Sequence, residues 1–285
     1  MNLTGSAKIA GIAGWPVEHS LSPLLHGHWI EEYDLDAAYV PFAIHPEDFR
    51  DAVEGLRLAG VKGVNVTAPH KQTAFAMADE TGRRAKIAGA ANLLVFRKDG
   101  IFADNTDNPG LVATLDAAMG AGAMKEKQAA ILGAGGMARA ALCALDEMGT
   151  AKIVLLARTL SRGEALAREV APMLAAEVSV AGFSAWEKAA ADTRLVVNAT
   201  SAGMKGFAPL DLPLEALPAG AAVFDAVYNP LRTDLLVRAE RRGLQAIDGL
   251  GLLMHQAVPS FEAFFGVKPQ VSAALRQKLK KALHA

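Results

Sequence analysis

Short apolar runs alternate with longer amphipathic stretches along most of this chain of 285 residues. The runs at 8–14, 63–66 and 129–132 have the length and composition of strands that are buried on both faces. The stretches between such runs have the length of helices. Strands that alternate with helices predict an α/β fold with mainly parallel sheets that are covered by helices.

The alternating pattern forms two series. The first predicts strands at 8–14, 38–42 and 63–66, a hairpin formed by 92–96 and 101–103, and helices at 23–33, 46–59, 69–78 and 110–119. The second predicts strands at 129–132, 152–156, 178–180, 195–198, 223–226 and 244–247, and helices at 136–148, 162–174 and 234–242. Two further helices, at 250–265 and 270–283, follow. We therefore expect two α/β domains.

Composition narrows the class of protein. The net charge of −1 offers no basic surface for a nucleic acid. Apolar residues make up 52% of the chain, but no run reaches the ~18 residues of a membrane span. The first ten residues carry one lysine and no long apolar core, so we expect no signal peptide and a cytoplasmic enzyme.

The thiol and imidazole groups do not indicate a reactive or metal-binding site. Cys143 is the single cysteine, and its apolar helical surroundings favour a small buried residue over a nucleophile. His26 and His28 are two residues apart and point to different sides of a helix. We expect neither an intrachain disulfide nor a bound metal.

A polar cluster follows the predicted strand at 63–66, with the sequence Asn65-Val66-Thr67-Ala68-Pro69-His70-Lys71. Pro69 suits the first turn of a helix, which places Lys71 near that helix's N-terminus. A cation there opposes the helix dipole at a cost of ~0.3–1 kcal/mol. The simpler interpretation is a solvated surface lysine, and the alternative is a lysine whose proton is needed for chemistry.

A glycine-rich turn links the predicted strand at 129–132 to the next helix, with the sequence Gly133-Ala134-Gly135-Gly136-Met137-Ala138. Gly133 permits the tight turn, Gly135 lets the backbone approach a pyrophosphate, and the helix N-terminus faces the phosphates. The strand–turn–helix context favours a dinucleotide site over an ordinary connection.

The segment after the next strand distinguishes NAD from NADP. An NAD site usually has an acidic residue about 20 residues on, which would repel a 2′-phosphate. Here the chain has Ala157 and Arg158 followed by Thr159 and Arg162, which offer a charged fork, a hydroxyl and a second charge. NADP is therefore favoured, although two arginines on a solvated helix face would give the same pattern.

Six further polar or glycine-containing motifs occur along the chain together with those described above. They are 14–23 with Ser20 and Ser22, 89–92 with Asn92, 104–107 with Asp107, 198–204 with Thr200, 225–230 with Tyr228, and 248–256 with Gly249 and Gln256. In order and spacing the set closely resembles the shikimate dehydrogenase family, from about Gly11 to Gly266. Ala157 departs from that family's usual Asn-Arg-Thr and removes one amide donor.

The resemblance implies roles for single residues. Lys71 and Asp107 look like a catalytic pair, although Asp107 also begins a good helix N-cap sequence. Ser20, Ser22 and Tyr228 look like contacts to a substrate carboxylate. The residues that look like contacts to ring hydroxyls are Asn65, Thr67, Lys71, Asn92, Asp107 and Gln256. Ordinary caps, strand ends or packed aromatics would explain several of these positions equally well. Thr200 and Gly249 would join the cofactor site.

The implied reaction is reversible, NADPH-dependent reduction of 3-dehydroshikimate to shikimate, within chorismate and aromatic amino-acid biosynthesis. Residues 1–107, joined by helices in 249–285, would bind the substrate, and 108–248 would form a Rossmann-like NADP-binding domain. Two alternatives stay open: a quinate/shikimate dehydrogenase that uses NAD, and a non-catalytic NADP-binding regulatory module. A homodimer is compatible with the sequence.

Overall fold

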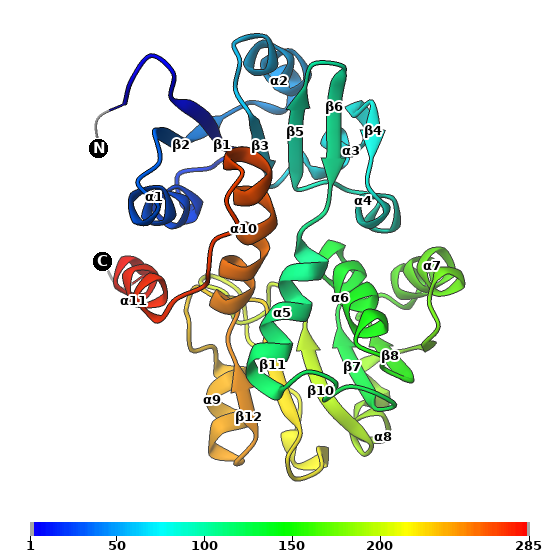
Figure 1. The fold of residues 1–285 in the computed structure, drawn as a ribbon. Coiled ribbons are helices and arrows are strands. Elements are labelled where there is room, and N and C mark those ends of the chain that lie inside the picture. The colour runs from blue at the N-terminus through cyan, green and yellow to red at the C-terminus, as the bar shows by residue number, and fades with distance from the viewer. Residues whose placement is uncertain (1–2, 284–285) are drawn as a thin grey trace. The chain divides into compact units, whose positions relative to one another are not determined.

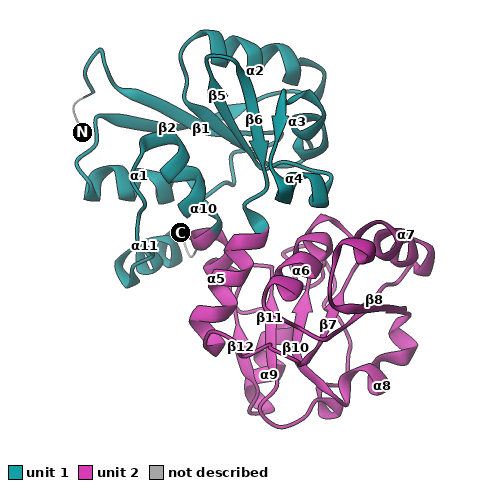
Figure 2. Ribbon diagram, turned by 45° about the vertical axis from the view of Figure 1, so that its right-hand side comes forward, with its two compact units in different colours: residues 1–107, 256–285 teal, residues 108–255 magenta. Residues whose placement is uncertain are grey.

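The computed structural model describes residues 3–283 and divides into two compact units (Figure 2). Unit 1 comprises Met1–Asp107 and Gln256–Ala285, and unit 2 comprises Asn108–His255. The chain leaves unit 1 at the start of helix α5 (Asp107–Met119) and returns to it within helix α10 (Leu250–Phe265).

The boundary between the two units lies within α10, so the residues from Leu250 to His255 are grouped with unit 2. The first turn of α10 belongs to unit 2 because it packs closely on α5. A Cβ atom at Gly251 would come within 2.7 Å of Thr114 Cγ2. Only a glycine lets the two helix backbones approach this closely.

Unit 1 is built on a mixed six-stranded sheet in the order β2-β1-β3-β5-β6-β4 (Figure 1). Its strands are β1 (Lys8–Gly14), β2 (Ala37–Ala43), β3 (Gly63–Val66), β4 (Glu80–Thr81), β5 (Leu93–Arg97) and β6 (Gly100–Asp104). Its helices are α1 (Ser22–Glu32), α2 (Phe49–Leu58), α3 (Lys71–Met77), α4 (Arg83–Ala88) and α11 (Ala273–Leu283), with a 3₁₀ turn, η1 (Pro46–Asp48), before α2.

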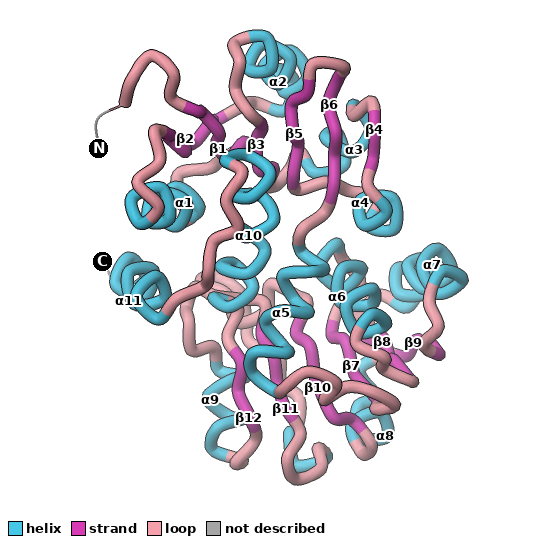
Figure 3. Tube along the Cα trace, viewed as in Figure 1, coloured by secondary structure: helices cyan, strands magenta, loops and turns pink. Residues whose placement is uncertain are grey.

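Strand pairing in unit 1 is parallel for β2-β1-β3 and for β4 with β6. Strand β5 runs antiparallel to both β3 and β6, so the predicted hairpin is confirmed (Figure 3). The sequence pattern did not predict β4 or α4, because each is too short to show a hydrophobic period. Helix α3 begins at Lys71, two residues later than predicted, and Pro69 lies in the turn before it.

Strand β3 separates two packing layers in unit 1. Val64 and Val66 join an apolar core with Phe49 and Val53 of α2. The alternate residues, Gly63 and Asn65, face α10: a Cβ atom at Gly63 would lie 2.7 Å from the ring of Phe264. This alternation follows from the two-residue period of a strand, and it places one amide between the sheet and α10.

Unit 2 carries a fully parallel six-stranded sheet in the order β12-β11-β10-β7-β8-β9. Its strands are β7 (Gln128–Leu132), β8 (Lys152–Leu156), β9 (Glu177–Ala181), β10 (Thr193–Asn198), β11 (Ala222–Asp225) and β12 (Gln245–Ile247). Its helices are α6 (Gly136–Glu147), α7 (Leu160–Val170), α8 (Trp186–Ala190) and α9 (Asp234–Arg241), with 3₁₀ turns η2 (Ala171–Met173), η3 (Phe183–Ala185) and η4 (Leu214–Ala216).

Counted along the chain, the strand order of unit 2 is 3-2-1-4-5-6. This is the doubly wound order that binds dinucleotides at the carboxyl ends of the strands, where the winding reverses. Buried side chains of β10 and β11, among them Val196 and Val223, pack with Trp186 and Leu235 to form a core on one face of this sheet. Within residues 3–283, no helix is both long and apolar enough to span a bilayer.

His26 of α1 is buried, and neither of its ring nitrogens has a hydrogen-bond partner among residues 3–283. Its ring stacks on Tyr39, with centroids 3.9 Å apart and planes inclined by 2°. Burial lowers the pKa of His26 from 6.5 to about 3. The folded protein therefore holds this imidazole neutral.

We predict that His26→Phe flattens the acid side of the stability profile. Above pH 6.5 His26 is neutral in both the folded and the unfolded state, so it does not change the free energy of unfolding. As the pH falls toward 3, the unfolded state takes up a proton that the folded state does not. Stability is then lost by up to about 1.4 kcal/mol per pH unit. Urea unfolding at several pH values measures this slope, with His45→Gln as a control for loss of an exposed histidine. Equal slopes in wild type and His26→Phe would contradict the prediction.

Candidate active site

The polar motifs of unit 1 meet at one edge of its sheet. Strands β1 and β3 are parallel neighbours, so the segments that follow Gly14 and Val66 leave from the same edge. Strand β5 runs the other way and therefore begins there, next to Asn92, while β6 ends there before Asp107. Four chain segments that are distant in sequence thus supply side chains to one place.

Lys71 and Asp107 form an ion pair at this edge. The Lys71 Nζ atom lies 2.7 Å from Asp107 Oδ2, and the two side chains are 36% and 19% exposed. The other carboxylate oxygen accepts a hydrogen bond of 2.9 Å from Asn92 Nδ2. Within the described residues, the Asp107 carboxylate therefore binds Lys71 and Asn92 and does not cap a helix.

Thr106 and Asn105 organise the same edge, although the sequence analysis did not select them as site residues. The Asn92 Oδ1 atom accepts from the backbone amide of Thr106 at 2.7 Å and from its hydroxyl at 3.2 Å. The Thr106 hydroxyl also lies 3.2 Å from Gln256 Oε1, and Asn105 Oδ1 accepts from the Asp107 amide at 3.0 Å. Their positions next to Asp107 in the motif at 104–107 were the sequence signal that could have identified them as site residues.

Ser20, Ser22 and Thr67 lie on the segments that follow β1 and β3. The Ser22 amide donates to Ser20 Oγ at 3.2 Å, and helix α1 has no side-chain cap. Neither serine hydroxyl serves as the cap that sequence reasoning offered as an alternative. Thr67 is fixed next to Gly14, where an added Cβ atom would approach Thr67 Cγ2 to 2.4 Å.

The glycine-rich turn of unit 2 has the geometry of a phosphate-binding loop. Gly133 follows β7 with a φ of 110°, and its amide donates a hydrogen bond of 2.8 Å to the carbonyl of Leu156 at the end of β8. Gly135 precedes helix α6 without a side-chain cap. An added Cβ atom at Gly135 or Gly136 would meet nothing within 4 Å, so the uncapped helix N-terminus is open to an anion.

Arg158, Thr159 and Arg162 are exposed at the carboxyl end of β8, beside this turn in the sheet. No ion pair or side-chain hydrogen bond engages either arginine within the described residues. Ala157 is buried against Gly163, where an added Cβ atom would lie 3.0 Å from Ala157 Cβ. The short Ala157 side chain therefore supports helix packing, and the arginines remain available to an anionic ligand.

A buried carboxylate fixes the ends of β10 and β11. Asp225 Oδ1 accepts from Asn198 Nδ2 at 2.9 Å and from the Val227 amide at 3.0 Å, and Oδ2 accepts from the Thr233 hydroxyl at 2.6 Å. Burial raises the pKa of Asp225, and these three hydrogen bonds oppose the rise. Asn198 Oδ1 in turn accepts from the hydroxyl of Thr200 at 2.7 Å.

Tyr228 and Gly249 follow β11 and β12 in unit 2. Burial raises the pKa of the Tyr228 phenol. Gly249 packs against strand-end backbone, since an added Cβ atom would lie 2.5 Å from the carbonyl oxygen of Ala226. Tyr228 thus belongs to unit 2, whereas the Lys71 cluster belongs to unit 1. Within residues 3–283, no three His, Cys, Asp or Glu side chains gather closely enough to hold a metal ion.

Parallel strands in the order 3-2-1-4-5-6, with a glycine turn open at the carboxyl end of the first, define a dinucleotide-binding unit. The other unit contains a lysine that is ion-paired with a carboxylate. These features are typical of dinucleotide-dependent oxidoreductases.

Comparison with known proteins narrows this class. Residues 12–94 match the family model described as shikimate dehydrogenase substrate binding domain, and residues 116–206 match the model described as shikimate/quinate 5-dehydrogenase. The shikimate dehydrogenase (NADP(+)) of Methylobacterium radiotolerans is 47% identical over 277 residues, which cover 95% of each chain. The chain belongs to the shikimate dehydrogenase family.

Solved structures agree with this assignment. Shikimate 5-dehydrogenase from Thermus thermophilus, in complex with NADP(H) and shikimate, is 32% identical with a TM-score of 0.82, covering 97% of this chain and 98% of that one. Quinate dehydrogenase from Corynebacterium glutamicum, in complex with NAD, is 27% identical with a TM-score of 0.88, covering 96% and 99%. The predicted α/β fold and family are therefore confirmed.

We predict that Gly133→Ala destabilises unit 2 whereas Gly135→Ala does not. Alanine at a φ of 110° is strained, and its Cβ atom would lie 2.7 Å from Thr200 Cγ2, so we expect a loss of about 1–3 kcal/mol. Gly135 has a φ of −100° and open space, so the change there should stay within about 0.5 kcal/mol. Denaturant unfolding of the two variants measures both values, and equal stability would refute the strain argument.

Proposed function

We propose that this protein catalyses the reversible reduction of 3-dehydroshikimate to shikimate with NADPH. The observation that carries the proposal is the Lys71–Asp107 pair, 2.7 Å apart, braced by Asn92 in the unit that matches the substrate-binding domain model. Relatives that are 43–47% identical over most of the chain carry the name shikimate dehydrogenase (NADP(+)). The reaction would serve chorismate and aromatic amino-acid biosynthesis in the cytoplasm.

NADPH, when bound, supplies the hydride that adds to the ring carbonyl carbon. Lys71 would donate the proton that the developing alkoxide oxygen needs, so that a C–H and an O–H bond form as the carbonyl π bond breaks. Asp107 holds the ammonium in place through its Oδ2 atom, and Asn92 holds Asp107 through Oδ1. The lysine is 36% exposed, which allows solvent to return its proton.

The remaining polar groups at the edge of the unit 1 sheet would bind the substrate. The hydroxyls of Ser20 and Ser22 suit its carboxylate. Side chains around the ion pair suit the ring hydroxyls: Asn65, Thr67, Lys71, Asn92, Asp107 and Gln256. We assign residues 1–107 with the C-terminal helices to substrate binding.

We assign residues 108–248 to NADP binding. The open N-terminus of α6 would receive the pyrophosphate, and the Gly133–Ala138 backbone would line it. The 2′-phosphate would lie against Arg158, with Thr159 and Arg162 as further donors. Thr200 and Gly249, at the ends of β10 and β12, would complete this edge of the site.

The strongest alternative is a quinate/shikimate dehydrogenase that uses NAD, since a quinate dehydrogenase bound to NAD shares this fold. Arg158 is exposed and has no ion-pair partner in the described part of the chain, and no acid stands at that position, which favours NADP. A regulatory module without catalysis has no need of the Lys71–Asp107 pair. A homodimer is compatible with either enzyme. Initial rates with shikimate or quinate and with NADP or NAD distinguish the three functions.

We predict that Lys71→Met lowers kcat by about 10²- to 10⁴-fold while the affinity for shikimate falls only modestly, because methionine keeps the length of the side chain and removes its proton and one substrate contact. Rates of shikimate oxidation measure kcat, and titration calorimetry measures binding. Lys62→Met, at an exposed lysine next to β3, is the matched control. A variant at position 71 with most of the wild-type turnover would remove the lysine from the mechanism.

We also predict that Arg158→Ala lowers the ratio of kcat/KM for NADP to that for NAD by about 10- to 100-fold, since a charge-assisted contact to a phosphate is lost. Arg158→Asp should lower it further by repulsion. Arg241→Ala, at an exposed arginine of α9, controls for loss of surface charge. An unchanged ratio in Arg158→Ala would mean that another group binds the 2′-phosphate.

A further inference from the structure

A buried hydrogen-bonded network joins Asn65 to strand β2 and helix α10. Asn65 Oδ1 lies 2.8 Å from the Tyr39 hydroxyl, and Asn65 Nδ2 lies 2.7 Å from Ser260 Oγ and 3.1 Å from the carbonyl oxygen of Asn92. Tyr39, Asn65 and Ser260 are each at most 7% exposed. All members of the network belong to unit 1.

The chemistry of the partners fixes the direction of each bond. A backbone carbonyl only accepts, so the atom that faces the Asn92 carbonyl must be the amide nitrogen. The oxygen of Asn65 then faces Tyr39, whose hydroxyl must donate, and Ser260 Oγ must accept. Burial raises the pKa of Tyr39 well above its usual value, which keeps the donor proton in place.

Counted over the described residues, this arrangement leaves the Asn65 side chain with one unused hydrogen-bonding capacity. Both amide protons are committed, to Ser260 and to the Asn92 carbonyl. The oxygen has accepted one hydrogen bond and can accept a second. Asn65 can therefore accept one further hydrogen bond from a hydroxyl, but both of its amide protons are already used.

Two features show that the network is more than strand packing. The other residues of β3 are Gly63, Val64 and Val66, so an apolar residue at position 65 would suit the strand without needing three polar partners. The ring of Tyr39 is also fixed, since it stacks on His26 at 3.9 Å. The hydroxyl of Tyr39 is thereby held at one point, beside the amide that it contacts.

We propose that Tyr39 and Ser260 are positioning residues that orient the Asn65 amide so that only its oxygen is offered to a ring hydroxyl of the substrate. This inference rests on the proposed function. The same network reaches the ion pair, because the Asn92 that accepts from Asn65 also donates to Asp107. The Asn65 amide is thus held at a fixed position relative to the Lys71–Asp107 pair.

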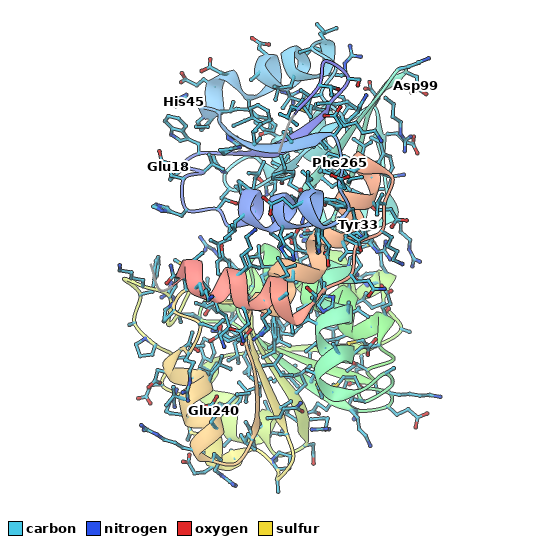
Figure 4. All side chains as sticks on the ribbon, turned by 60° about the vertical axis from the view of Figure 1, so that its left-hand side comes forward. Glu18, Tyr33, His45, Asp99, Glu240 and Phe265 are labelled. Atoms are coloured by element: carbon cyan, nitrogen blue, oxygen red, sulfur yellow. The ribbon has the colours of Figure 1, made fainter. Side chains whose placement is uncertain are left out.

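The first test is Tyr39→Phe, which removes the hydroxyl and retains the stacked ring. The KM for shikimate should rise about 3- to 10-fold, with kcat and the KM for NADP close to wild type, because a contact made in both ground and transition states is weakened. Ser260→Ala should act in the same way. Tyr33→Phe is the matched control, since the hydroxyl of Tyr33, at the end of α1 (Figure 4), meets the Gln270 amide outside the network.

The second test repeats both substitutions in an Asn65→Ala background. If Tyr39 and Ser260 act through Asn65, their effects on the KM for shikimate should vanish there. Undiminished effects in that background would overturn the proposal, as would an unchanged KM in Tyr39→Phe. A general loss of stability would persist in both backgrounds and is distinguished in this way.

A spectroscopic readout makes the test independent of turnover. The side-chain amide signal that disappears from the ¹⁵N–¹H spectrum of Asn65→Ala identifies Asn65. That signal should shift in Tyr39→Phe and in Ser260→Ala and stay unchanged in Tyr33→Phe, and an unshifted signal would overturn the proposed orientation. A wild-type enzyme without activity on shikimate would instead overturn the proposed function and the substrate part of this inference, while the amide signal would still decide whether the two residues hold Asn65.

Discussion

The ion pair between Lys71 and Asp107 is the interaction on which the unit 1 site depends. Lys71 is the first residue of α3, where a positive charge meets the positive end of the helix dipole at a cost of ~0.3–1 kcal/mol. A carboxylate oxygen 2.7 Å away offsets that cost. Because the pair is partly exposed, solvent screens it and its contribution to stability is small.

The antiparallel hairpin β5–β6 brings the amide that braces this pair to the same edge of the sheet. In a purely parallel sheet, the start of one strand and the end of the next lie at opposite edges. Reversing β5 brings its start, with Asn92, to the edge where β1 and β3 end, and β6 then returns the chain to the same edge with Asp107. The reversed strand thus lets the residue before β5 and the residues after β6 supply side chains to one site.

Much of this arrangement could be predicted from sequence, because the strong signals are local. The strands at 8–14 and 63–66, the hairpin and the glycine turn each follow from a pattern within a few residues. The hydrogen-bond partners could not be predicted in this way. Tyr39 and Ser260 lie 26 and 195 residues from Asn65, and no spacing rule connects them. Short elements such as β4 and α4 were missed because two to six residues carry no period.

Burial decides what each of two aspartates does. Asp225 is fully buried, and three donors hold it where burial alone would favour the neutral acid, so it anchors the ends of β10 and β11 beside the glycine turn. Asp107 keeps 19% of its side chain exposed and shares its two oxygens between an ammonium and an amide. A carboxylate whose oxygens are engaged by neutral donors holds the surrounding backbone in place. A carboxylate that faces a partly solvated lysine holds the ammonium of that lysine in position. The same residue type thus supports a rigid loop edge in unit 2 and orients a lysine ammonium in unit 1.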